Sequence, residues 1–185
     1  MTRLLWNGTP MNLNPANYSN RSVLALVALA CAGLLGSGYF LQYFQGQDPC
    51  PLCHVQRGFY YAVMLVCLVG AVHGPRGRWA AAYAGAAFVF AAAGAATATR
   101  QVWLQHLPPE LVPACGPDIF FMFDNFPLRR TLEKLFAGSG QCAEVKWRFL
   151  GLSIAEWSLA WFVFFCVVAL WLAWRSLRAR RGPGA

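Results

Sequence analysis

Four long apolar segments constrain the fold of this chain more than any other feature of its sequence. Each segment approaches the roughly 20 residues that an α-helix needs to cross the hydrocarbon core of a bilayer. Lipid offers no hydrogen-bond partner to backbone polar groups, so an apolar segment that crosses it forms a helix. The segments cover residues 23–41, 52–72, 79–99 and 155–174. We therefore predict an all-α membrane protein, a bundle of four transmembrane helices in a single membrane domain over residues 1–185.

Composition supports this class of protein. Hydrophobic residues make up 58% of the 185 residues and charged residues only 12%, which lies outside the range of soluble globular domains. The predicted spans leave two longer connections on one side of the membrane, residues 42–51 and 100–154. The chemistry of the chain is expected there, because all of its extramembrane cysteines fall in these connections or at their edges.

Charge predicts the orientation of the bundle. Arginines without acidic neighbours lie in the N-terminal arm, in the connection between the second and third spans, and in the C-terminal tail. The positive-inside rule assigns such regions to the cytoplasm. All seven acidic residues lie in, or at the edges of, the other two connections. Both termini are thus predicted to be cytoplasmic, and the net charge of +8 reflects orientation and headgroup contact rather than nucleic-acid binding.

The stretch of residues 48–57, DPCPLCHVQR, opens the second span and carries two cysteines. Pro51 suits the first position of a helix because its missing N–H would have no partner there, which puts Cys50 near the N-cap. A thiolate at a helix N-terminus is stabilised by unpaired N–H groups, and Arg57 adds a full positive charge nearby. We therefore expect a lowered pKa for at least one of Cys50 and Cys53.

The length of the second span fixes the depth of this pair. The uncharged run 58–72 has about 15 residues, short of the roughly 20 needed to cross, so the helix has to include residues 52–57. Cys50 and Cys53 then lie at the membrane boundary, with Arg57 just inside it. A charged residue within a span is costly and is by default a functional candidate, although it can also extend its head group to the interface. A redox pair at the lipid surface suggests a lipid-soluble electron acceptor.

The chain has seven cysteines, which sort by place. Cys31, Cys67 and Cys166 lie inside spans and are interpreted as small buried hydrophobic residues. The other four, Cys50, Cys53, Cys115 and Cys142, lie on the predicted external side and allow three disulfide connectivities, which the sequence leaves open. Proximity makes Cys50–Cys53 and Cys115–Cys142 the simplest resting arrangement. A two-residue loop gains little stability from closure, so the tight pair is more typical of redox activity than of bracing.

The second external loop also carries a helical pattern over residues 127–136. Leu128, Leu132, Leu135 and Phe136 fall on one face, and the charged residues lie elsewhere. This pattern predicts a short amphipathic helix, which either lies along the membrane surface or caps the end of the bundle.

The same residues are compatible with other functions. Cys50, Cys53 and His54 match the attachment pattern of c-type haem, with His106 as a possible axial ligand, which would make the chain a membrane electron carrier. A four-cysteine zinc site is weaker, because Cys115 and Cys142 lack the close spacing of a ligand pair, and no metal is predicted. A structural protein whose disulfides only brace the loop is the remaining alternative.

Together these features resemble the DsbB family of bacterial inner-membrane disulfide-forming proteins. The resemblance covers nearly the whole chain: four spans, a Cys-x-x-Cys motif that opens the second span and continues into Gln56 and Arg57, and a second external loop with two cysteines. Residues 139–144 (SGQCAE), Trp147, residues 149–152 (FLGL) and Trp157 are also similar to the family's pattern. This combination is far more specific than the Cys-x-x-Cys motif alone.

The resemblance implies a multi-pass protein of the bacterial inner membrane whose cysteine loops face the periplasm. Its partner would be a DsbA-like thioredoxin-fold protein, which it reoxidises, and the electrons would pass to ubiquinone or menaquinone. By the same resemblance, Cys115 would form the mixed disulfide with the partner and Cys142 would pass reducing equivalents to Cys50. Cys53 would face the quinone, and Arg57 would help to bind it and stabilise charge.

The resemblance leaves one residue of the quinone site open. The family also uses a polar residue near the start of the second external loop, for which Gln101 and His106 are both candidates. A likeness to vitamin K epoxide reductases ranks second, since that family also joins a four-helix bundle, a Cys-x-x-Cys motif and a quinone. Those proteins usually place the quinone-facing pair late in the chain, whereas here it opens the second span.

Overall fold

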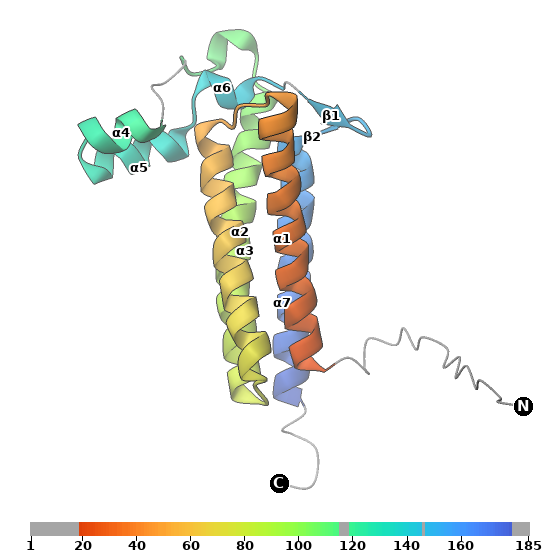
Figure 1. The fold of residues 1–185 in the computed structure, drawn as a ribbon. Coiled ribbons are helices and arrows are strands. Elements are labelled where there is room, and N and C mark those ends of the chain that lie inside the picture. The colour runs from red at the N-terminus through yellow and green to blue at the C-terminus, as the bar shows by residue number, and fades with distance from the viewer. Residues whose placement is uncertain (1–18, 115–118, 146, 179–185) are drawn as a thin grey trace, which may run out of the picture.

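The computed structural model describes residues 19–114, 119–145 and 147–178. Within these residues, four long helices stand side by side in a bundle (Figure 1): α1 (Asn20–Gln45), α2 (Pro51–His73), α3 (Arg78–Gln105) and α7 (Ile154–Arg178). Each is long and apolar enough to cross a membrane, and each contains one of the segments found in the sequence. The predicted four-helix membrane bundle is confirmed.

Local residues explain where the first two helices begin and end. The hydroxyl of Ser19 accepts a hydrogen bond from the N–H of Ser22 at 3.2 Å and caps the start of α1. α1 ends at Gly46 with φ of +62°, and α2 ends at Gly74 with φ of +63°. Glycine adopts this left-handed conformation without the cost that a Cβ imposes. The two glycines therefore stop the helices where the chain has to turn.

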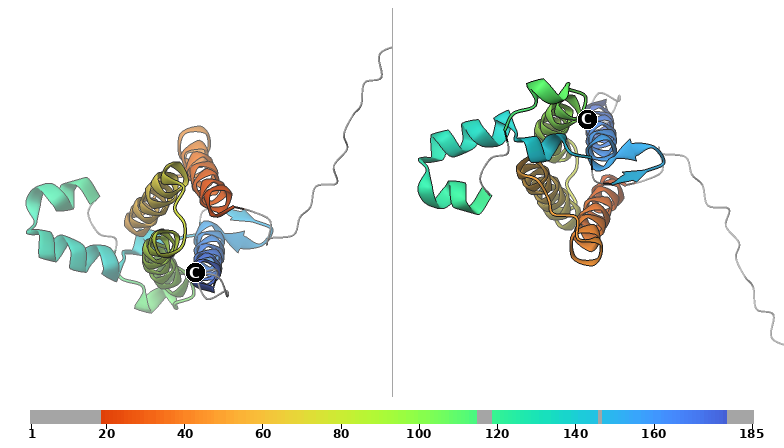
Figure 2. Two further views of the ribbon diagram at one scale, coloured as in Figure 1. Left: turned by 90° about the horizontal axis from the view of Figure 1, so that it is seen from below. Right: turned by 90° about the horizontal axis from the view of Figure 1, so that it is seen from above.

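The four helices surround a common core, with α3 packed against both α2 and α7 (Figure 2). Small residues make this close packing possible: a Cβ added at Gly94 of α3 would overlap the ring of Phe162 on α7. The same ring stacks on Tyr60 of α2, with centroids 4.2 Å apart and planes 17° apart. The small-residue composition of the third span thus places this helix inside the bundle, as expected from the sequence.

α1 and α7 are joined at the end of the bundle where α1 begins and α7 ends. Arg175 donates a hydrogen bond to Oδ1 of Asn20 at 2.6 Å, and Asn20 donates one to Oγ of Ser176 at 3.4 Å. Along the rest of their described length the two helices have only sparse backbone contacts. Toward the opposite end, side chains from both helices line a cavity.

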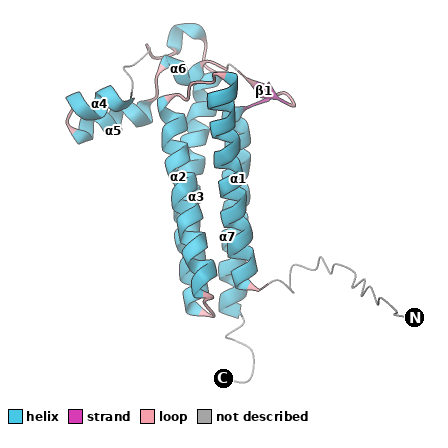
Figure 3. Cartoon of the chain, viewed as in Figure 1, coloured by secondary structure: helices cyan, strands magenta, loops and turns pink. Residues whose placement is uncertain are grey.

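The connection between α3 and α7 forms the opposite end of the molecule. It contains the short 3-10 helix η2 (Pro109–Leu111), α4 (Ile119–Asn125), α5 (Leu128–Ala137), α6 (Gly140–Ala143), β1 (Arg148–Phe149) and β2 (Leu152–Ser153). The two strands pair antiparallel in a hairpin (Figure 3). α4 and α5 project from one side of the bundle and the hairpin from the other, while α6 contacts α2 and α3 between them (Figure 1).

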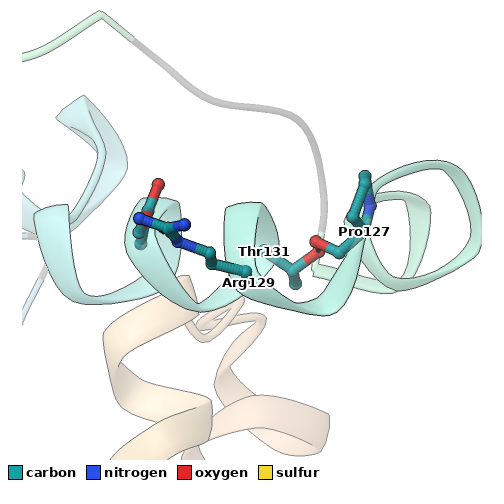
Figure 4. A network of polar contacts seen from close by, with 4 residues as sticks. Pro127, Arg129 and Thr131 are labelled. Atoms are coloured by element: carbon teal, nitrogen blue, oxygen red, sulfur yellow. Dashed lines mark hydrogen bonds and ion pairs between the residues drawn. The ribbon is translucent and has the colours of Figure 1, made fainter.

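The predicted amphipathic helix is present as α5, shifted by one residue from 127–136. Figure 4 shows Thr131 and Arg129 on its first turns, close to Pro127. The hydroxyl of Thr131 donates to the carbonyl of Met122 on α4 at 3.0 Å and lies 3.4 Å from the carbonyl of Pro127. Arg129 and Glu133 form an exposed ion pair at 2.9 Å, which contributes little to stability because solvent screens it.

The apolar face of α5 is divided in the structure. Leu128, Leu132 and Phe136 are exposed, whereas Leu135 is only 3% exposed and turns toward the bundle, where α5 contacts α2. The sequence grouped all four on one face. The helix therefore packs against the protein through Leu135 and leaves Leu128, Leu132 and Phe136 exposed.

Candidate active site

The first turn of α2 holds two cysteine sulfurs together. Pro51 is the first residue of the helix and Cys50 is its N-cap, as the sequence predicted. The Sγ of Cys50 accepts a hydrogen bond from the N–H of Cys53 at 3.4 Å, so it occupies the position that an N-cap side chain normally fills. The two Sγ atoms lie 2.8 Å apart, and both cysteines are free thiols in this structure.

A third sulfur reaches the pair from α6. Cys142 has no exposed surface, and it packs with Leu52, Leu104 and Cys50 in a small cluster separate from the main core. Its thiol hydrogen-bonds with that of Cys50. Cys50 therefore lies between Cys53 on one side and Cys142 on the other, an arrangement that allows a disulfide to pass from one pair to the other.

The fourth external cysteine, Cys115, lies outside the described residues. The resting arrangement Cys50–Cys53 with Cys115–Cys142 therefore stays a prediction. What the structure adds is the contact between Cys142 and Cys50, which belong to different pairs in that arrangement.

The position of Cys142 favours its thiolate. The hydrogen bond from the Cys50 thiol lowers the pKa of Cys142 to about 6, and the backbone N–H groups of Ser139 and Leu52 act in the same direction against the cost of burial. The pKa of Cys50 is raised, because its proton is held between the two neighbouring sulfurs and because the thiol is buried. At neutral pH the Cys142 thiol of the reduced protein is therefore mostly ionised.

This charge distribution can be measured. In the fully reduced protein, thiolate absorbance near 240 nm should contain a component with a midpoint near pH 6, which is present above that pH and lost below it. The sign follows from the lowered pKa, since the group stays ionised until the pH falls through that value. Cys142→Ser should remove this component. A titration unchanged by the substitution would contradict the assignment.

Gln101 of α3 faces the sulfur pair. Its amide nitrogen donates to the Sγ of Cys50 at 3.4 Å and to the Sγ of Cys53 at 3.3 Å. Its amide oxygen accepts a hydrogen bond from Nε2 of Gln56 at 2.6 Å, and both glutamines are buried. Of the two polar candidates from the sequence, Gln101 is the one in contact with the reactive sulfurs.

The histidines have other surroundings. His106 is exposed at the end of α3, and its Nδ1 donates to the carbonyl of Val102 at 2.8 Å. His54 follows the cysteine pair in α2, and its backbone N–H donates to the carbonyl of Cys50 at 3.2 Å. Among the described residues, no group of three or more His, Cys, Asp or Glu side chains is arranged to hold a metal ion.

Arg57 lies one turn beyond Cys53 and is held by neutral groups of α1. Its Nη1 donates to Oε1 of Gln42 at 2.6 Å and its Nη2 to the carbonyl of Gly38 at 3.1 Å. The guanidinium also lies over the ring of Tyr39, 4.6 Å from its centroid. In the part of the chain that the structure describes, no carboxylate pairs with Arg57. Its positive charge is therefore positioned without being neutralised.

Cys53, Arg57 and Gln101 border a cavity of about 400 Å³ between α1 and α7. This volume falls within the range of roughly 300–1,000 Å³ that small-molecule sites occupy. The remaining wall is largely apolar and aromatic, with contributions from α1, the hairpin and α7 that include Leu34, Phe40, Phe149, Trp157 and Trp161. The arrangement suits a flat, apolar ligand with polar oxygens at one end.

The sequence did not identify Gln56 as a site residue, nor the aromatic residues of α7 that line the cavity. Gln56 carried a usable signal, because it is a polar residue inside an apolar segment and lies three positions after Cys53, on the same face of the helix. The aromatic residues of α7 carried none, since tryptophans near the end of a span are also expected at a membrane interface.

Comparisons with known proteins agree with this geometry. A family model described as Disulfide bond formation protein DsbB matches residues 20–172. A relative from Hahella chejuensis is 45% identical over 161 residues, which cover 86% of this chain and 96% of the relative. Relatives from Azoarcus sp. (45% over 154 residues; 83% and 92%) and Chromobacterium violaceum (43% over 166 residues; 90% and 98%) are similar. All three are named disulfide bond formation protein B.

Proposed function

This chain belongs to the DsbB family of disulfide bond formation proteins, and on that premise we propose how its site works. The protein is a membrane disulfide oxidoreductase. We propose that it reoxidises a DsbA-like thioredoxin-fold dithiol and transfers the electrons to a membrane quinone, ubiquinone or menaquinone. The observation that carries this proposal is the position of the Cys50 sulfur between those of Cys142 and Cys53. Cys53 in turn borders the apolar cavity.

Thiol–disulfide exchange accounts for the first half of the reaction. A partner thiolate attacks the Cys115–Cys142 disulfide, forms a mixed disulfide with Cys115 and releases Cys142. The Cys142 thiolate then attacks Cys50 of the Cys50–Cys53 disulfide and releases Cys53. The second partner thiol frees Cys115, which attacks Cys142 and restores the Cys115–Cys142 disulfide. The partner has then lost two electrons and two protons, and Cys50 and Cys53 are both reduced. The low pKa of Cys142 supports its role as attacking group.

The cavity supports a quinone as the electron acceptor. A bound quinone supplies the capacity to take up the two electrons and two protons of the Cys50–Cys53 dithiol and to leave as a quinol. The aromatic and aliphatic wall would hold the ring and exclude water, and Cys53 lies at the wall, where its sulfur can face the ring. Arg57 would hold a quinone oxygen and stabilise negative charge there, because a cation acts strongly in such a dry site.

The sparse contact between α1 and α7 gives this ligand a way in. Both helices line the cavity, and they are joined by hydrogen bonds at the end of the bundle where α1 begins and α7 ends. A lipid-soluble molecule could therefore enter from the bilayer between them. The first residue of α1 and the last residue of α7 lie at the end of the bundle opposite the cysteines (Figure 1). With the arginine distribution, this supports an inner-membrane protein with cytoplasmic termini and periplasmic cysteine loops.

The direct test is quinone reduction by the purified, detergent-solubilised protein. A reduced thioredoxin-fold dithiol protein is supplied as electron donor, a short-chain ubiquinone as acceptor, and the reaction is followed by quinone absorbance. We expect catalytic turnover that requires both the donor and the protein. Absence of turnover with either ubiquinone or menaquinone analogues, in a protein whose four external cysteines are shown to be oxidised, would favour a structural role. A Soret band would support the haem alternative instead.

Arg57 should act on the quinone half of the reaction alone. We expect Arg57→Met to raise the KM for quinone about 10-fold to 100-fold, since hydrogen bonds to charged groups contribute about 1.5–3 kcal/mol. Single-turnover exchange between the reduced partner and the protein, measured without quinone, should keep its rate. Arg57→Lys should have a KM for quinone between those of the unaltered protein and Arg57→Met. Lysine keeps the positive charge but cannot make both contacts of the guanidinium, with Gln42 and with the carbonyl of Gly38. Unchanged quinone kinetics in Arg57→Met would contradict this role.

A further inference from the structure

Two buried glutamines form a chain of hydrogen bonds that ends on the sulfur pair. Gln56 of α2 donates from Nε2 to the amide oxygen of Gln101 on α3, at 2.6 Å. The amide nitrogen of Gln101 then reaches both Sγ atoms, that of Cys50 at 3.4 Å and that of Cys53 at 3.3 Å. Each glutamine is 5% exposed, so water does not compete freely for these contacts.

The direction of this chain matters because an amide has two different ends. Its NH₂ group can only donate hydrogen bonds and its oxygen can only accept them. A thiolate or a disulfide sulfur has no proton to donate, so it is matched by the NH₂ end and opposed by the oxygen end. If Gln101 were turned over, its oxygen would face both sulfurs, and only protonated thiols would suit it. In the orientation that the structure has, the Cys53 thiol also lies 3.7 Å from that oxygen, a longer contact than the two made by the NH₂ group.

We propose that Gln56 is a positioning residue that fixes the direction of the Gln101 amide, so that Gln101 donates to the sulfurs of Cys50 and Cys53. By holding the oxygen of Gln101 on its own N–H, Gln56 turns the NH₂ group toward the sulfurs. Gln101 touches the reacting atoms and Gln56 does not, so Gln56 acts only through Gln101. This inference rests on the proposed function in one respect, that Cys50 and Cys53 cycle between dithiol and disulfide.

The consequence is a more oxidising Cys50–Cys53 disulfide. An N–H donor stabilises sulfur most when the sulfur carries negative charge, because charge-assisted hydrogen bonds are the stronger ones. A thiolate at a helix N-terminus is itself favoured, so the reduced pair gains more from this donor than the disulfide does, and the pair accepts electrons from Cys142 more readily. The charged groups that line the cavity beside these sulfurs in the described chain are Arg57, Asp48 and Glu144, and Cys142 contacts Cys50 from α6. In the test below Arg57, Asp48 and Glu144 stay unchanged in every protein, and Cys142 is replaced in all of them.

The test is the equilibrium of Cys50–Cys53 with glutathione at a fixed pH. The full chain in detergent carries Cys115→Ala and Cys142→Ala, so that one external pair remains, and quinone is left out. The reduced fraction is read by alkylation and mass analysis of the peptide that contains Cys50 and Cys53, which keeps the cysteines within the spans from interfering. Four proteins are compared: this background, Gln56→Met, Gln101→Met and the double variant.

We expect Gln101→Met to shift the equilibrium constant about 10-fold toward the disulfide, or about 30 mV in potential. Gln56→Met should shift it about 3-fold in the same direction, as one amide hydrogen bond is lost. In the Gln101→Met background, Gln56→Met should add nothing, because the two effects share one route. Equal shifts from Gln56→Met in both backgrounds, or no shift in either, would overturn the proposal.

Thr97→Val serves as the matched control. Thr97 is also buried on α3, one turn before Gln101, and its hydroxyl donates to the carbonyl of Gly94 at 2.7 Å without contacting the sulfurs. This variant should keep the equilibrium constant of the background; a shift as large as that of Gln56→Met would mean that loosening of α3 causes the effect, and the proposal would fail. Since quinone is absent, these outcomes are independent of turnover, and the proposed function fails only if the unaltered protein does not reduce quinone.

Discussion

Cys53→Ser should abolish quinone reduction and leave the four-helix bundle intact. Cys53 is the member of the sulfur pair that borders the cavity on the side of Arg57, and without it the Cys50–Cys53 disulfide cannot form. Apart from Cys53, the only described sulfur that contacts Cys50 is that of Cys142, so no replacement disulfide returns electrons to the cavity. The assay is quinone absorbance with a reduced thioredoxin-fold donor, in which turnover should fall to the uncatalysed background.

The matched control is Cys166→Ser. Cys166 is a half-buried cysteine of α7 that packs against the main core, away from the sulfur cluster. We expect this variant to retain turnover, and both variants to keep the helical content and melting temperature of the unaltered protein within a few degrees, since a single small substitution costs about 1 kcal/mol. Turnover that persists in Cys53→Ser would contradict the thiol-to-quinone route.

Cys142→Ser should separate the two halves of the reaction. Among the described residues, Cys142 provides the only sulfur of the external loop that contacts the sulfur pair, so the variant should lose all quinone reduction driven by a protein dithiol. A small dithiol such as dithiothreitol can reduce Cys50–Cys53 directly through the open cavity. With this donor we expect quinone reduction to continue.

The measurement is the same absorbance assay run with the two donors in parallel. Loss of turnover with both donors would mean that Cys142 supports the structure of the site rather than the transfer of electrons. Full turnover with the protein donor would mean that the partner reduces Cys50–Cys53 without the loop. Serine is suited to the buried position because it keeps the size of the side chain and can retain the hydrogen bond with Ser139.

Much of the fold was predictable because its signals are local. The four spans follow from runs of apolar residues, and lipid leaves such runs no alternative to a helix. The placement of Cys50 at the N-cap follows from Pro51, which is tolerated at the first helical position and almost nowhere else in a helix. The amphipathic helix α5 follows from its periodicity, although the division of its apolar face, with Leu135 turned inward, depends on what α5 packs against.

The candidate site was predictable only in part. Cys50, Cys53 and Arg57 were found because a single short motif holds them, and spacing along one helix determines which side chains share a face. The choice between Gln101 and His106 could not be made from spacing. Both lie near the end of the same helix, and only the position of α2 beside α3 puts the amide of Gln101 against the sulfurs.

By itself, the sequence determined the membrane class, the four helices, the sulfur pair at a helix N-terminus and the positive charge one turn further on. The tertiary structure alone decided that Cys142 lies against Cys50, that Gln56 and Gln101 form one hydrogen-bonded chain, and that α1 and α7 stand far enough apart to leave a cavity. The physical reason is the range of the forces involved. Hydropathy, capping and helix periodicity act within a few residues, whereas these contacts join residues far apart in the chain and exist only once the helices have packed.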